Sequence, residues 1–304
     1  MAENGNSNGR WLALIVVALL ALACIAAPLV LHFGQKRHNH LPWDIATLYP
    51  AEQAIVPGEV FAATTAAILE HELNGGTGWR PNDFFLWGPS LWADNNSNRQ
   101  LGILQALRES TRVLKDNLTR VSSNEFDGNL LLADTALRNE ATKLWLPSAE
   151  GKYREAVQRL RDYIAGLKSQ PIKSRPINLR NVELIRLFQA WTDLLGNAHA
   201  ILYHEQSAWR TDDDFYRAQG NAHAISQLVK AVDREYQPQL ANRPVLGELF
   251  NEVAAALNHA AALKPLIVFD GRSDGIFANH RRNLDAYISE ARQKMYSIRD
   301  ELEK

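Results

Sequence analysis

The chain of 304 residues is poor in cysteine and has no excess of either charge. Its one cysteine, Cys24, lies in an apolar stretch, so the chain cannot form an internal disulfide and cysteine usage does not indicate a compartment. The 33 basic and 34 acidic residues give a net charge of −1. That balance supplies no basic face for phosphates, and we therefore expect no nucleic-acid partner.

Sequence signatures of common enzyme chemistries are also missing. The chain has no Gly-rich phosphate loop, no Gly-x-Ser-x-Gly turn, no His-Glu-x-x-His motif and no cysteine nucleophile outside the apolar stretch. Nor does it show a convincing alternation of apolar and polar residues, which a sheet would require. These absences favour a helical protein without a cofactor.

An uncharged apolar run from Trp11 to Phe33 is the most prominent feature that is present. A helix over this run can cross a hydrocarbon core of roughly 30 Å, so we predict one transmembrane helix. Ala21 to Ala23 would suit cleavage of a signal peptide, but the apolar run continues for ten residues beyond Ala23. An uncleaved anchor is therefore the preferred interpretation.

The apolar run and the proline-rich segment after it divide the chain into four parts. Proline and histidine are frequent just after it, which is typical of a tether, and the remainder is long enough for a substantial core. We predict a tail over 1–10, a transmembrane helix over 11–33, a juxtamembrane linker over 34–57 and a helical bundle domain over 58–304.

Apolar residues in the last part recur at alternating spacings of three and four. Such a seam is typical of helices packed nearly parallel or antiparallel to one another. The spacing predicts an all-α fold, an antiparallel bundle of about seven to eight helices. Four such seams run over 104–121, 153–167, 188–202 and 215–236, and further helices are expected near 58–73, 127–146, 245–263 and 279–302. Ser148, Asn178 and Thr211 are expected to cap the starts of three helices.

A short motif occurs twice. His71-Glu72 is followed by Trp79-Arg80, and His204-Glu205 is followed by Trp209-Arg210. The match has two explanations: an ancient duplication into two related halves, or convergence on one helix-turn-helix solution.

The two His-Glu pairs are also the best candidates for a metal site. If they meet, His71, Glu72, His204 and Glu205, with His199 nearby, could bind zinc or iron. Against this, Glu-x-x-His on facing helices, which builds metal sites in bundles, is absent at these positions. His199 lies on a predicted seam, where a histidine satisfied by one hydrogen bond is ordinary. We therefore expect no metal.

Aromatic residues gather between 79 and 92. Trp79, Phe85, Trp87 and Trp92 are candidates for lining an apolar groove that binds lipid or peptide, or for dipping into a membrane interface. The alternative is that they cap one end of the helical core. No basic residues flank them as they often do in interfacial segments, which favours the capping role.

The apolar N-terminal run, the stretch from His71 to Phe85 and the turn from Asp270 to Asn279 together resemble a bacterial family of membrane-anchored proteins, the family of unknown function numbered 2333. The resemblance covers nearly all of the chain after the run. It implies a bacterial inner-membrane location and brings no activity, cofactor or catalytic residue.

From these observations we expect a single-pass protein of the bacterial inner membrane whose bulk faces the periplasm. The favoured function is non-enzymatic: a scaffold or adaptor that holds protein partners beside the membrane, because seam-spaced helices outnumber convergent polar groups. The alternatives are a metal-dependent hydrolase of an envelope substrate and a lipid- or peptide-binding module.

Overall fold

The computed structural model describes residues 5–83, 94–120, 125–204, 210–265, 267–271 and 278–304. Within these ranges the regular structure is helical, apart from one isolated bridge between Asp270 and Asn279. The prediction of an all-α bundle is confirmed. The helices are α1 (Gly5–His38), α2 (Ile45–Leu48), α3 (Glu59–Asn74), α4 (Asn95–Val113), α5 (Gly128–Leu137), α6 (Ala149–Leu167), α7 (Asn181–Tyr203), α8 (Thr211–Leu240), α9 (Pro244–Ala262) and α10 (His280–Glu303).

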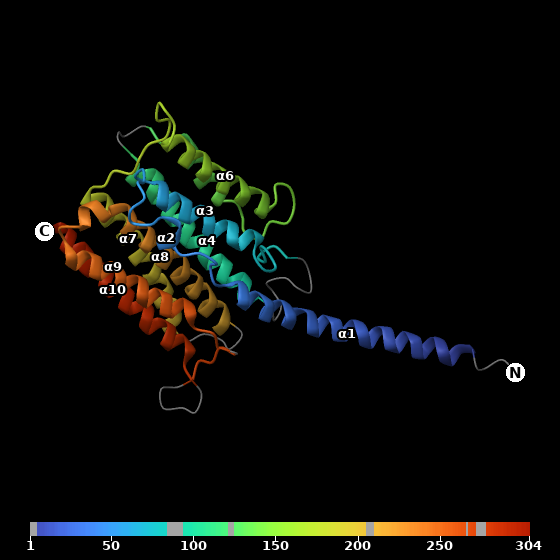
Figure 1. Ribbon diagram of the computed structural model, residues 1–304. Coiled ribbons are helices and arrows are strands. Elements are labelled where there is room, and N and C mark those ends of the chain that lie inside the picture. The colour runs from blue at the N-terminus through green and yellow to red at the C-terminus, as the bar shows by residue number, and fades with distance from the viewer. Residues whose placement is uncertain (1–4, 84–93, 121–124, 205–209, 266, 272–277) are drawn as a thin grey trace.

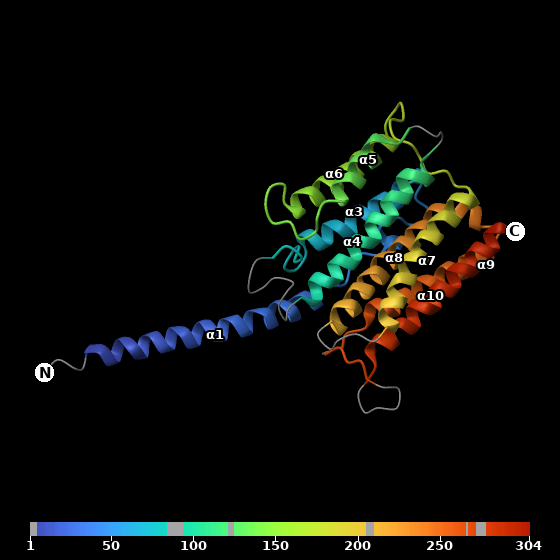
Figure 2. The same ribbon diagram turned by 180° about the vertical axis from the view of Figure 1, so that it is seen from behind.

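Helix α1 projects away from one end of the bundle (Figures 1 and 2). Its segment Gly9–Ala27 is long and apolar enough to cross a membrane, and none of that segment is buried by the rest of the chain. A signal sequence would have the same character. The helix does not end with the apolar run at Phe33 but continues to His38, through the first part of the segment predicted as a linker.

The other helices form one body with a connected core. Helices α5 and α6 lie outside α3 and α4, whereas α7 to α10 form the opposite side of the bundle (Figures 1 and 2). Buried apolar residues from α3 through α10 belong to the same hydrophobic cluster. The apolar seams predicted from the sequence lie on the buried faces of the helices: Leu104, Leu160 and Leu195, for example, are fully buried.

Helices α4 and α8 cross very closely at two glycines. A Cβ atom on Gly102 would lie 2.0 Å from the carbonyl oxygen of Arg217, and one on Gly220 would lie 2.0 Å from that of Arg99. Both distances are far below van der Waals contact, so this crossing needs glycine on each helix.

One predicted helix is too long. We expected a helix over 127–146, but α5 ends at Leu137. Arg108 of α4 donates from Nε to the carbonyl oxygen of Leu137, at 2.6 Å, and from Nη2 to that of Asn139, at 2.6 Å. These bonds satisfy carbonyl groups at the helix end, and the chain then turns towards α6.

Candidate functional site

The first predicted His-Glu pair lies where α3 meets α1. His71 Nε2 donates to the carbonyl oxygen of His38, at 2.6 Å, at the end of α1. The Glu72 side chain is 1% exposed and accepts a hydrogen bond from Arg99, at 2.9 Å. The pair therefore connects α3 to its neighbours.

The second pair lies beside α10. The carbonyl oxygen of His204 accepts from Arg281 Nη2, at 2.8 Å, and Glu205 lies outside the described residues. His199 is paired with Asp285, with 2.6 Å between His199 Nδ1 and Asp285 Oδ1. Among the described residues, no three His, Cys, Asp or Glu side chains are grouped to hold a metal ion.

Of the aromatic candidates, Trp79 is part of the core. It is 4% exposed, its Nε1 donates to the carbonyl oxygen of Ala141 at 3.0 Å, and its ring meets that of Tyr153 edge to face. The other three candidates, Phe85, Trp87 and Trp92, lie outside the described residues.

The chain just after α1 is fastened to the bundle by a buried arginine. Arg99 donates from Nη1 to Glu72 and from Nη2 to the carbonyl oxygen of Asn39, at 3.1 Å. We call Arg99, Glu72 and Asn39, with the His71–His38 bond, the anchor joint. Further along, Arg234 of α8 donates to the carbonyl oxygens of Tyr49, Pro50, Ala51 and Gln53. These bonds fix the predicted linker onto the surface of the bundle.

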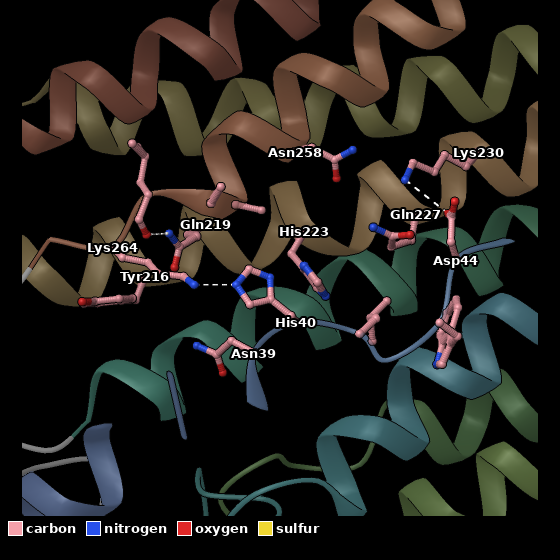
Figure 3. A pocket seen from close by; sticks show the side chains of 15 residues that line it. Asn39, His40, Asp44, Tyr216, Gln219, His223, Gln227, Lys230, Asn258 and Lys264 are labelled. Atoms are coloured by element: carbon pink, nitrogen blue, oxygen red, sulfur yellow. Dashed lines mark hydrogen bonds and ion pairs between the residues drawn. The ribbon is translucent and has the colours of Figure 1, made fainter. Parts of the chain in front are cut away.

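A cavity of about 330 Å³ lies between this fastened segment, α8 and the end of α9. We call it the proximal pocket, and Figure 3 shows the side chains that line it. Its walls are rich in amide and basic groups. They comprise Asn39, His40, Leu41, Trp43, Asp44, Tyr216, Gln219, His223, Gln227, Lys230, Asn258, Ala261, Ala262, Leu263 and Lys264.

Three side chains of the pocket lining, Asn39, Tyr216 and His223, each have a buried polar atom without a hydrogen-bond partner among the described residues. His223 is 8% exposed, and the atom concerned is its Nε2. Burial holds the pKa of His223 well below its usual range, and the nearby positive charges of Arg99 and Lys230 lower it further. The imidazole is therefore neutral at physiological pH, in a positive electrostatic environment.

The mouth of the pocket carries two lysines. Lys264 Nζ donates to His40 Nε2, at 2.5 Å, and Lys230 Nζ lies 3.5 Å from Asp44 Oδ1 (Figure 3). Burial and the charge of Lys264 both lower the pKa of His40. Lys264 has a neutral imidazole as its partner, whereas Lys230 lies beside the Asp44 carboxylate. A bound anion would therefore face the ammonium group of Lys264 and several amides.

The proximal pocket was not predicted from the sequence. Its residues come from three segments that are separated in the chain, and His40 belongs to the histidine-rich segment that the sequence predicts as a tether. One signal was available: Gln219, His223 and Gln227 recur every fourth residue within 218–229, where most of the other positions are apolar. Such a polar stripe on a buried helix indicates a polar cavity or a hydrogen-bond network.

A model of the family DUF2333, described as an uncharacterized protein conserved in bacteria, matches residues 6–202 and 196–304. No curated protein and no solved structure matches the chain.

Proposed function

The chain belongs to the bacterial DUF2333 family, and on that premise we propose that it is a non-enzymatic scaffold or adaptor at the inner membrane, with its bundle in the periplasm. In this proposal α1 is a permanent membrane anchor. The bundle contacts a protein partner, and the proximal pocket receives an anionic or amide group of that partner.

One observation carries the proposal. The segment 39–44 directly follows the anchor helix, is held to the bundle by Arg99, and forms one wall of the proximal pocket. With α1 as the anchor, this attachment supports a pocket held at a fixed position beside the membrane rather than at the end of a mobile tether. A fixed position beside the membrane is what an adaptor for another membrane protein requires.

The chemistry of the pocket suits binding better than catalysis. Its described lining has two lysines, three histidine or aspartate side chains and five amide or hydroxyl side chains, but no cysteine or serine nucleophile. Amide and ammonium groups recognise carboxylates and carbonyls through hydrogen bonds, which gives specificity without a reaction.

Photo-cross-linking in intact cells tests the proposal. A benzoylphenylalanine replaces Trp43, a lining residue of similar size, and the control position is Tyr296, which is 44% exposed on α10. We expect a discrete protein adduct from position 43 that Lys264→Glu weakens several-fold. The matched charge reversal Lys304→Glu, at an exposed site far along the chain, should leave the adduct unchanged.

The same adducts from positions 43 and 296, or none from position 43, would contradict the adaptor function. Elemental analysis of the purified full chain tests its non-enzymatic part. Near-stoichiometric zinc or iron that disappears in the His71→Ala/His204→Ala variant would favour a metal-dependent hydrolase instead.

A further inference from the structure

Among the described residues of the bundle, the loop that joins α5 to α6 carries the most exposed apolar side chains. Leu146 is 95% exposed, Trp145 is 78% exposed and the adjacent Leu144 is 38% exposed. Three consecutive apolar residues in water are unfavourable, and a patch of this kind marks a contact with another apolar phase.

The base of this loop is firmly held, so the exposure of its tip is built into the fold. Trp79 Nε1 donates to the carbonyl oxygen of Ala141, and Asn82 Nδ2 donates to that of Lys143, at 3.3 Å. The N–H of Ala149 donates to the same Lys143 carbonyl oxygen, at 3.0 Å, which closes the chain around the tip. Nothing in these bonds covers Leu144, Trp145 or Leu146.

The loop lies at the end of the bundle from which α1 leaves, as both views show (Figures 1 and 2). Contacts along the chain agree with this placement. His71, near the end of α3, bonds to His38 at the end of α1, and the segment 79–82 that follows α3 holds the loop. A membrane crossed by α1 would therefore face this loop.

We propose that the tip of the α5–α6 loop, residues 144–146, inserts into the interface of the same bilayer that α1 crosses. A tryptophan with its N–H towards water, beside leucines that reach the acyl chains, is the composition that bilayer interfaces favour. Two contacts, the anchor and the tip, would fix the tilt of the bundle and hence the direction in which the proximal pocket opens. This inference rests on the membrane anchor of the proposed function.

Site-directed fluorescence on the full chain tests the proposal. Cys24→Ser removes the only cysteine, and single cysteines at Leu146, Ile172 or Val17 then carry an environment-sensitive nitrobenzoxadiazole dye. Ile172 is 62% exposed in the segment after α6, at the opposite end of the bundle, and Val17 is 61% exposed in α1. Each protein is reconstituted in phosphatidylethanolamine–phosphatidylglycerol vesicles.

For the dye at position 146 we expect quenching by lipids with a nitroxide near the headgroup, and at least three-fold weaker quenching by aqueous iodide than at position 172. Iodide quenching at 146 equal to that at 172, with position 17 in lipid, would overturn the insertion while leaving the anchor intact. Protection from iodide without lipid quenching would also overturn it, because a protein would then cover the tip. Iodide access at position 17 would overturn the anchor itself.

Discussion

At the scale of single residues, the close crossing of α4 and α8 shows that the neighbours of a glycine determine whether a larger residue can replace it. Gly196 and Gly220 begin the same six-residue sequence, Gly-Asn-Ala-His-Ala-Ile. A Cβ on Gly220 would strike the backbone oxygen of Arg99, whereas one on Gly196 would meet only the end of the Arg292 side chain, at 3.1 Å. The identical sequences therefore have different structural roles.

We predict that Gly220→Ala lowers the free energy of unfolding by at least about 2 kcal/mol, because two helices must move apart. Gly196→Ala should be neutral or stabilising by up to about 1 kcal/mol, since alanine favours the helix and the arginine side chain can move. Chemical denaturation of the full chain in detergent, followed by circular dichroism, measures both. Equal effects of the two substitutions would contradict the close crossing.

A buried glutamate caps the start of α3. Glu235 of α8 is 2% exposed and accepts hydrogen bonds from the backbone N–H groups of Gly58, Val60 and Phe61, at 3.0, 2.7 and 3.0 Å. Burial, assisted by the charge of Glu59, raises the pKa of Glu235 to about 7, although the three N–H groups act in the opposite direction.

This raised pKa predicts a pH dependence of stability. Between its ordinary value of 4.5 and about 7, Glu235 holds a proton in the folded chain that the unfolded chain has released. The stability that this proton contributes is therefore complete below pH about 4.5 and is lost as the pH rises through about 7.

We expect the unfolding midpoint to decrease less between pH 5 and 8 in Glu235→Gln than in the wild type. The exposed control Glu248→Gln should keep the wild-type slope, and a slope unchanged by Glu235→Gln would refute this role.

At the scale of elements, the anchor joint depends on one buried ion pair. The side chains of Arg99 and Glu72 are 3% and 1% exposed. Removal of Arg99 leaves a buried carboxylate unpaired and also frees the carbonyl oxygen of Asn39. We predict that Arg99→Met destabilises the chain by about 3–5 kcal/mol.

A double substitution separates the two effects. Arg99→Met with Glu72→Gln leaves no unpaired charge and should recover part of the lost stability, yet the carbonyl oxygen of Asn39 stays unbound. Hydrogen–deuterium exchange should therefore remain faster than in the wild type over 39–44 in both variants. Wild-type exchange there in the double variant would show that Arg99 does not hold the segment.

The helices were largely predictable because apolar residues at helical spacing indicate which face of a helix is buried. The ends of the helices were less predictable. Helix α4 begins at Asn95, well before Leu104, the first residue of its apolar seam. Its first turns are buried although they are polar, as at Asn98, Arg99 and Gln100. A pattern search for apolar seams cannot find such turns. The end of α5 depends on Arg108 from another helix, which only the folded structure reveals.

The candidate site was predictable only in part, for the same physical reason. His71 and Glu72 were found, but as parts of a metal site, whereas the structure gives them partners on α1 and α4. The proximal pocket depends on contacts between residues 39–44, α8 and the end of α9, and no local pattern encodes that proximity. Only the polar stripe of Gln219, His223 and Gln227 on α8 pointed to it.

At the scale of the whole molecule, the described helices after α1 form one connected core rather than two separate bundles. The predicted 34–57 linker is fastened to that core by Arg99 and Arg234. The position of the bundle relative to α1 is thus part of the fold. The proposed function and the proposed insertion of the loop tip both require that α1 remains in the mature protein as a membrane-spanning helix.

Fractionation of cells that produce the full chain with a C-terminal epitope tag tests this most directly. We predict a full-length species that stays with the inner membrane through carbonate extraction and loses its tag when protease is added to spheroplasts. A shorter, soluble periplasmic species that lacks α1 would contradict the account, because α1 would then be a signal sequence and neither the anchor joint nor the loop tip would meet a membrane.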